Sequence, residues 1–295
     1  MAAVSGEQRN KFGRESHVRG GESDARLHAS HLLRPVLRAS EVKEMQSVEP
    51  SGLVAAKSFL ITQDYAKYTP DQHALWSELV ERRMAQLKEC ACREYLEGWE
   101  ALGLEQKQIP HLGRVSELLE KRTGWRVQPV SGFMPSRAFF EMLAARQFPT
   151  TTWLRSRESM DYIPEPDILH DAMGHLPMFA EQHFADAVAE YGRVCHSMES
   201  EEKLERMGRL YWYTFEFGLI RQEGAVKVYG SGVASSQAEC TNVLSGGCEI
   251  RDFTVEEVLN TTVKVDEVHK RLFAIHSFAE IMGAVREAKE IVDGA

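Results

Sequence analysis

The sequence contains no long hydrophobic run. None of its apolar stretches approaches the roughly 18 residues that a membrane-spanning helix requires. The first residues are polar and include no apolar core of the kind that marks a secretory signal peptide. These absences exclude the usual sequence patterns of a membrane-anchored or secreted protein. We therefore expect a cytoplasmic protein with no membrane partner.

Cysteine is also scarce, and its spacing matches no common metal or redox motif. The five cysteines are Cys90, Cys92, Cys195, Cys240 and Cys248. No two of them form a C-x-x-C pair, which argues against a zinc ribbon or a thioredoxin-type site, and their odd number does not suit a disulfide framework. We expect all five to be reduced, as is usual for cysteines of cytosolic proteins.

Blocks of basic residues are missing as well. The chain has 35 Lys and Arg against 44 Asp and Glu, which gives a net charge of −9. This balance argues against nucleic acid or an anionic membrane as the main partner, because both are bound through clustered positive charge. What the chain does have is apolar residues, which make up 43% of its 295 residues. That proportion is enough to bury a sizeable core.

Two regions differ in composition. Residues 1–50 are rich in Ser, Gly, Glu and Arg, and we expect them to form a disordered tail. Residues 51–295 carry long helical periodicities, and we expect them to form one domain. Its predicted fold class is mainly α, a single helical domain with small peripheral β strands.

The strongest helical pattern runs from Pro70 to near Gly103, with Asp71 as the expected N-cap. A second long helix is predicted over 201–222. Short segments with alternating or β-branched residues predict strands, and they lie at 125–130, 225–230 and 261–265.

The most informative stretch is 164–175, which contains two histidines, His170 and His175, among acidic residues. Residues five apart lie about 140° from each other on a regular α-helix, so these histidines would not share a face. Zinc proteases use a spacing of four with a glutamate directly after the first histidine, which this sequence does not match. Gly174 lets the helix end or bulge, so that His175 could swing back towards His170.

A third candidate ligand is Glu216, the only carboxylate in the apolar run 211–220. An unpaired buried carboxylate costs several kcal/mol or takes up a proton, and a divalent cation removes that cost. Two imidazoles and one carboxylate form the ligand set of non-haem Fe(II) oxygenases, which leaves coordination positions open. Zinc with the same ligands is the competing interpretation. From spacing alone, buried structural histidines explain the pattern equally well.

The remaining histidines have no comparable neighbours in the sequence. We interpret them as surface or structural residues: His17, His28, His31, His73, His111, His183, His196, His269 and His276.

These segments together resemble the pterin-dependent aromatic amino acid hydroxylase family. The resemblance rests on 164–175, on 211–219 around Glu216, and on 129–139 and 229–236, which follow in the family's order. It extends from about residue 65 to the C-terminus. It implies a catalytic domain that uses Fe(II), tetrahydrobiopterin and dioxygen.

The resemblance also implies roles for single residues. His170, His175 and Glu216 would be the iron ligands. The pterin would stack on Phe139, and Asp171 stands where the family usually has a glutamate near the pterin.

A loop would add backbone hydrogen bonds to the pterin, and it comprises Gly132, Phe133 and Met134. Arg155 matches the arginine that binds the substrate's carboxylate, a task that suits a guanidinium. Asp167 would hold Arg155 in place, and Ser235 would also reach the carboxylate. Trp212 and Phe217 would line the aromatic pocket.

The expected substrate is a free aromatic amino acid. A tryptophan at position 212 resembles the phenylalanine hydroxylases, so we expect L-phenylalanine to be converted to L-tyrosine. Attack at another ring position, or hydroxylation of tryptophan, stays open because Phe215 and Ser231 depart from the family's usual valine and alanine. A zinc-dependent hydrolase and a non-catalytic helical binding module are the alternatives from other classes. No tetramerisation helix is recognisable at the C-terminus, so we expect a monomer.

Overall fold

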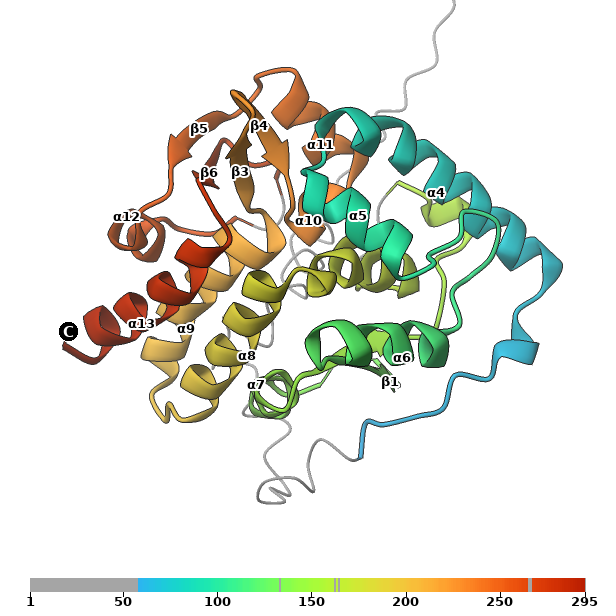
Figure 1. Ribbon diagram of the computed structural model, residues 1–295, viewed down its shortest axis with the longest axis horizontal. Helices are drawn as coiled ribbons and strands as arrows, with labels where there is room; N and C mark the ends of the chain where they lie inside the picture. The colour runs from blue at the N-terminus through green and yellow to red at the C-terminus, as the bar shows by residue number, and fades with distance from the viewer. Residues whose placement is uncertain (1–57, 133, 162, 164, 265–266, 295) are drawn as a thin grey trace, which may run out of the picture.

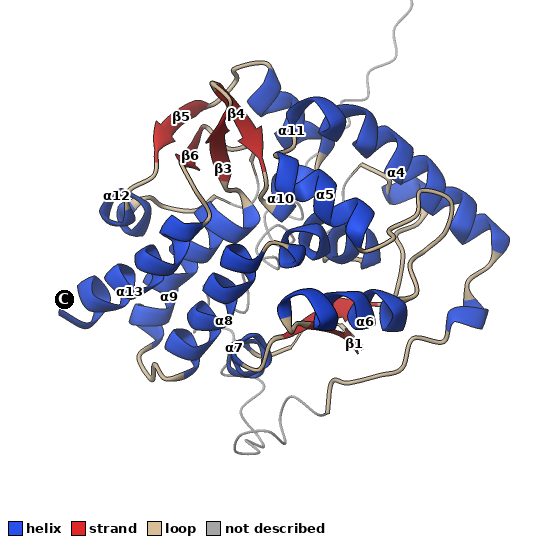
Figure 2. Cartoon of the chain, viewed as in Figure 1, coloured by secondary structure: helices blue, strands red, loops and turns tan. Residues whose placement is uncertain are grey.

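The computed structural model describes residues 58–132, 134–161, 163, 165–264 and 267–294 (Figure 1). The described chain is mainly helical, with two small sheets (Figure 2). The prediction of a mainly α fold is therefore confirmed. The expected tail over 1–50 lies outside the described residues.

The N-cap of the first long helix, α4 (Pro70–Cys90), is Thr69 rather than the predicted Asp71. The Thr69 side chain accepts a hydrogen bond from the backbone N–H of Gln72, and the Gln72 side chain accepts one from the N–H of Thr69. This reciprocal capping box, with Pro70 in the first helical position, satisfies the free N–H groups of the first turn. Asp71 lies inside that turn instead.

The prediction of one continuous helix to Gly103 was wrong, because the chain breaks at Ala91 and Cys92 before α5 (Arg93–Ala101). Both residues have extended backbone. The N–H of Cys92 donates to the carbonyl oxygen of Val228 at 2.9 Å, and Ala91 forms a bridge with the same residue. A strand far along the chain therefore competes successfully for backbone groups that periodicity assigns to a helix.

The other regular helices surround the centre of the chain, and α13 packs across α8 and α9 (Figure 1). They are α6 (Leu112–Thr123), α7 (Ser136–Ala144), α8 (Gln182–His196), α9 (Glu201–Tyr211), α10 (Ser231–Ser235), α11 (Gln237–Leu244), α12 (Val255–Asn260) and α13 (Ala279–Gly294). Short 3-10 segments are η3 (Tyr65–Lys67), η4 (Arg157–Ser159) and η6 (Leu176–Ala180).

The smaller sheet pairs β1 (Arg126–Val130) with β2 (Gln147–Thr151) in parallel, and α7 connects them. The larger sheet has the order β4-β3-β6-β5. Its strands are β3 (Leu219–Gln222), β4 (Ala225–Val228), β5 (Glu249–Asp252) and β6 (Arg271–Ile275).

Two predictions in this region were wrong. Residues 219–222 are a strand rather than the end of a helix over 201–222, and residues 261–264 contain no strand. The sequence analysis missed β6, whose residues after Arg271 are all buried between two neighbouring strands. A strand covered in this way shows no alternation of polar and apolar residues, so its period cannot be read.

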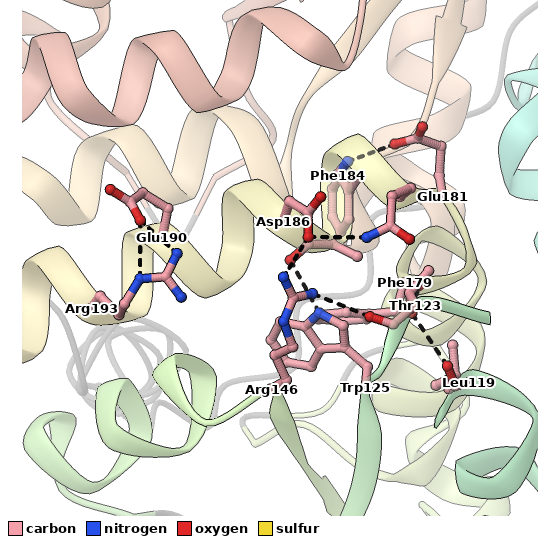
Figure 3. A network of polar contacts seen from close by, with 12 residues as sticks. Leu119, Thr123, Trp125, Arg146, Phe179, Glu181, Phe184, Asp186, Glu190 and Arg193 are labelled. Atoms are coloured by element: carbon pink, nitrogen blue, oxygen red, sulfur yellow. Dashed lines mark hydrogen bonds and ion pairs between the residues drawn. The ribbon is translucent and has the colours of Figure 1, made fainter. Parts of the chain in front are cut away.

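A polar network fastens the β1–β2 sheet to α8 (Figure 3). Arg146 bridges the carbonyl oxygen of Thr123, at 3.2 Å, and the carboxylate of Asp186. Trp125 donates its indole N–H to a carbonyl of α8 at 3.1 Å, and the Thr123 hydroxyl donates to the carbonyl of Phe179 at 2.8 Å. These bonds hold η6, the segment that directly follows His175, in a fixed position.

Candidate metal centre and substrate site

His170 and His175 lie at the two ends of η5 (His170–His175), a π-helical segment. Hydrogen bonds in a π-helix join residues five apart, so the first and last residues of η5 come to lie over each other. Their rings are 5.0 Å apart between centroids. The predicted bulge is therefore present, and it solves the problem that the spacing of five poses on a regular helix.

Gly174 contributes to this arrangement in a different way from the one expected. A Cβ atom at this position would lie 2.9 Å from the carbonyl oxygen of Ser231 and 3.1 Å from its Cβ. The glycine is therefore needed because η5 approaches the backbone of α10 closely. That contact places the two histidines next to α10, whose first residue, Ser231, also bonds to Glu216.

Glu216 ends a second π-helical segment, η7 (Trp212–Glu216), which continues α9. Its Oε1 lies 3.1 Å from Nε2 of His175, and its Oε2 lies 3.8 Å from Nε2 of His170. One ligand atom from each of the three side chains lies within 4.8 Å of the other two. The structure thus brings together the three residues that the sequence analysis selected.

Protonation states at this cluster suit metal binding. Burial lowers the pKa of His170 to about 4, so this imidazole is neutral at neutral pH. Burial alone would raise the pKa of Glu216, but the nearby His175 and His170 and the Ser231 hydroxyl lower it to about 2. A neutral imidazole and an ionised carboxylate are the forms that coordinate a cation.

Two serine hydroxyls orient these side chains. Ser231 donates to Oε2 of Glu216 at 2.7 Å, and Ser235 contacts Nδ1 of His170 at 2.9 Å. The second contact directs Nε2 of His170 towards Glu216. The sequence analysis gave Ser231 no role, although its difference from the family's usual alanine marked the position.

The donor set fits a ferrous ion. Ligands about 2.1 Å from a metal lie about 3–3.5 Å from each other, and the measured separations need only a small contraction to reach this. Two neutral imidazoles and a carboxylate on one side of the ion match the non-haem Fe(II) ligand set. An ion at this point would also balance the charge of Glu216.

Arg155 and Asp167 form a buried ion pair beside this centre. Nε and Nη2 of Arg155 each donate to the carboxylate of Asp167 at 2.9 Å, which makes the contact bidentate. Nη1 of Arg155 donates to the carbonyl oxygen of Met160 at 3.1 Å. Asp167 also accepts from the backbone N–H of His170 at 3.1 Å. A guanidinium has five N–H groups, so two remain for another acceptor. Arg155 lines a small cavity together with Ser235.

Trp212 and Phe217 are both buried and pack against each other, with ring centroids 4.6 Å apart. Their other neighbour is His269, whose ring lies 4.2 Å from that of Phe217. Trp212 donates its indole N–H to Nε2 of His269 at 2.7 Å, and Nδ1 of His269 lies 2.8 Å from Oε1 of Glu239. The absence of neighbours in the sequence therefore misled us about His269, because its partners come from distant segments.

The hydrogen bonds of His269 fix its tautomer. The indole of Trp212 can only donate, so Nε2 of His269 carries no proton and accepts. Nδ1 therefore carries the proton and donates it to Glu239. We define Trp212, Phe217, His269 and Glu239 as the aromatic wall.

The predicted pterin residues lie around α7 and β2. Phe139 is half-buried, with its ring edge-on to Tyr211 at 5.9 Å. Gly132 has a φ of 146°, and Met134 is buried in a small apolar cluster. Phe133 lies outside the described residues.

Asp171 is held in place by β2. Its Oδ2 accepts from the backbone N–H and from the hydroxyl of Thr151, both at 2.7 Å. Burial raises the pKa of Asp171 to about 6. The residue therefore joins η5 to β2, a structural contact that sequence position did not indicate.

Comparison with known proteins decides the family. The family model described as biopterin-dependent aromatic amino acid hydroxylase matches residues 58–293. The chain belongs to this family. The phenylalanine-4-hydroxylase of Ralstonia nicotianae is 36% identical over 236 residues, which cover 80% of this chain and 75% of that protein.

Solved structures agree with this membership. A Chromobacterium violaceum phenylalanine hydroxylase with bound Fe(III) has a TM-score of 0.77 and 34% identity, and the match covers 83% of this chain and 90% of that one. The same enzyme with iron(III) and 7,8-dihydrobiopterin also has a TM-score of 0.77, with 33% identity over 88% of this chain and 94% of that one. The expected enzyme class and its iron and biopterin cofactors are thereby confirmed, and the zinc hydrolase alternative finds no support. Among the described residues, no helix is long and apolar enough to cross a bilayer.

Proposed function

We propose that this protein is an Fe(II)- and tetrahydrobiopterin-dependent monooxygenase that converts L-phenylalanine to L-tyrosine. The convergence of His170, His175 and Glu216 carries the proposal, because it offers iron three ligands and leaves one side open. Iron and tetrahydropterin held at this site would supply the activation of dioxygen that hydroxylation of the ring requires. The names of the relatives favour phenylalanine as that substrate.

Arg155 binds the carboxylate of the amino acid in this proposal. Its two-pronged contact with Asp167 fixes the guanidinium plane and leaves donors free beside the cavity that Ser235 also lines. Because Asp167 also holds the backbone of His170, the substrate's carboxylate and the metal are positioned by a shared residue. In this proposal the Ser235 hydroxyl contacts the ring of His170 and also the substrate's carboxylate, because Ser235 lines the same cavity as Arg155.

The aromatic ring of the substrate packs against Trp212 and Phe217. Both rings are buried, so substrate binding there excludes water from the reacting carbon.

We assign the pterin to the loop at Gly132, Phe133 and Met134, with Phe139 as the stacking partner. Asp171, fixed by Thr151, lies next to the first iron ligand and borders that space.

The remaining assignments concern the whole chain. We propose that residues 51–295 form the catalytic domain, which acts as a cytoplasmic monomer without nucleic acid or membrane partners, and that residues 1–50 form a tail. The excess of acidic residues supports the absence of nucleic acid binding.

The decisive experiment incubates the Fe(II)-loaded protein with tetrahydrobiopterin, oxygen and, separately, phenylalanine, tyrosine and tryptophan. Chromatography of the products identifies both the substrate and the ring carbon attacked. We expect tyrosine from phenylalanine. A different hydroxylated product would replace the proposed specificity, and no hydroxylated product from any of the three would refute the proposed function.

A further inference from the structure

Two buried cysteines lie in contact at a place that the hydroxylation site does not use. Cys90, the last residue of α4, and Cys240, in the first turns of α11, have their sulfur atoms 3.1 Å apart. They are 150 positions apart in the sequence. In a disulfide the sulfur atoms are about 2.05 Å apart, so a movement of about 1 Å would join them.

A buried arginine lies beside this pair. Arg83 donates Nε to the carbonyl of Ala234 at 3.1 Å and Nη1 to Gln86, while its Nη2 has no hydrogen-bond partner among the described residues. A buried N–H group of a guanidinium is costly to leave unpaired. Since the charge of Arg83 acts on Cys240, an ionised sulfur at Cys240 would supply a negative partner for this guanidinium.

Charge and hydrogen bonding favour that ionised form. The contact with Cys90 and the positive charge of Arg83 together lower the pKa of Cys240 against the opposing effect of burial. The contact with Cys240, together with burial, raises the pKa of Cys90. These opposite directions favour a thiol at Cys90 beside a thiolate at Cys240, and the thiolate is the reactive state of cysteine.

The other three cysteines differ in this respect. Burial raises the pKa of Cys92 to about 12, and it also raises the pKa of Cys195 and Cys248. Within the described residues, the one contact between cysteine sulfur atoms is that of Cys90 with Cys240. Cys92, Cys195 and Cys248 therefore serve as internal controls for the oxidation of Cys90 and Cys240.

We propose that Cys90 and Cys240 form a reversible dithiol–disulfide site that reacts with small hydroperoxides. The Cys240 thiolate attacks one oxygen of ROOH and the O–O bond breaks, which gives a sulfenic acid and an alkoxide that takes up a proton. Cys90 then attacks the sulfenic sulfur, so that the S–S bond forms, the S–O bond breaks, and the hydroxide leaves as water with the proton of Cys90. The cysteines lose two electrons, and the hydroperoxide is reduced to an alcohol and water.

A small oxidant suits the location. Cys90 and Cys240 are both buried. One turn before Cys90, the Gln86 side chain donates an exposed hydrogen bond of 2.9 Å to the hydroxyl of Thr241, the residue after Cys240. A small hydroperoxide reaches buried sulfur atoms more readily than a bulky protein oxidant does. The cross-link would tie α4 to α11, which lie against each other in Figure 1. Arg83 of α4 already bonds to the carbonyl of Ala234, the residue before Ser235.

The test exposes the full-length protein to graded hydrogen peroxide, both with iron and after chelation, and then alkylates the remaining thiols in denaturant. We expect the number of alkylated cysteines to fall from the five free thiols to three, because one disulfide consumes two. Mass spectrometry should find Cys90 and Cys240 in one cross-linked peptide pair, and dithiothreitol should restore all five thiols.

Variants make the assignment specific. Cys90→Ser should stop at a sulfenic acid on Cys240 that dimedone traps, Cys240→Ser should abolish both products, and Cys195→Ser should leave the cross-link intact. Five thiols that all stay reduced, a cross-link between other cysteines, or a reaction that occurs only when iron is present would overturn the proposal.

Discussion

The two ends of η7 lead to two buried groups of histidine and glutamate with opposite properties. At Glu216, Nε2 atoms of two imidazoles and the carboxylate face a common point. At Trp212, both ring nitrogens of His269 are already paired, one with the indole and one with Glu239. Burial of histidine with glutamate therefore does not by itself indicate a metal site. The direction of the imidazole nitrogens does, because only the first group leaves lone pairs for a cation.

The largest expected difference between the groups concerns their carboxylates. Glu216→Gln should lower bound iron from about one per chain to less than about a tenth, and hydroxylation by more than about 100-fold, because even residues that only support metal ligands contribute about 10–100-fold. Glu239→Gln should keep its iron. Elemental analysis and product chromatography measure both effects, and similar iron loss in the two variants would contradict the comparison.

The variant Arg155→Lys tests substrate binding separately from metal binding. Lysine keeps a positive charge next to Asp167 but cannot make the two-pronged contact, so we expect KM for phenylalanine to rise about 10–100-fold. Iron content should stay near that of the unaltered protein. Loss of iron in this variant would mean that Arg155 supports the metal rather than the substrate.

Ser231→Ala removes the 2.7 Å hydrogen bond to Glu216. We expect the dissociation constant for Fe(II) to rise about tenfold, since hydrogen bonds to ligands orient them for the metal. Competition with a chelator of known affinity measures the change, and Ser245→Ala, at an exposed serine, is the matched control. Equal affinity in the two variants would show that the Ser231 bond does not orient the carboxylate.

The smallest effect on binding is expected in the aromatic wall. His269→Leu leaves the indole N–H of Trp212 and the carboxylate of Glu239 unpaired, which should lower the free energy of unfolding by about 1–3 kcal/mol and raise KM a few-fold. His269→Gln should recover both, because its amide can accept from Trp212 and donate to Glu239. Denaturant unfolding, KM and kcat measured side by side test this. Equal losses in both variants, or iron loss in either, would show that the hydrogen bonds of His269 to Trp212 and Glu239 are not what these measurements report.

The sequence analysis could select His170, His175 and Glu216 because each carried a local signal, and the structure brings the three side chains together. His170 and His175 stood out through their acidic neighbours and Gly174, and Glu216 stood out as a single charge in an apolar run. The roles of these residues as iron ligands stay predictions. The pairing of His269 with Glu239 in the aromatic wall had no such signal, since these two residues lie in separate segments and meet only in the folded chain.

Errors in the fold had a similar origin. The helix from Pro70 ends early because Cys92 donates its N–H to the carbonyl oxygen of Val228, with which Ala91 pairs in a β-bridge. The helix after Glu201 ends early because η7 turns the chain into β3. Periodicity within a segment contains no information about a competing partner more than a hundred residues away. Ser235 illustrates the same limit, because only the structure shows that its hydroxyl contacts His170.

By itself, the sequence determined the helical fold class, the family and the three side chains that converge. These follow from short-range patterns: apolar periodicity, the order of motifs, and an isolated charge among apolar residues. Only the tertiary structure decided which imidazole nitrogens are free, where the helices break, and that Cys90 meets Cys240 beside Arg83. The physical reason is that hydrogen-bond partners, burial and local charge depend on segments that the sequence separates and packing brings together.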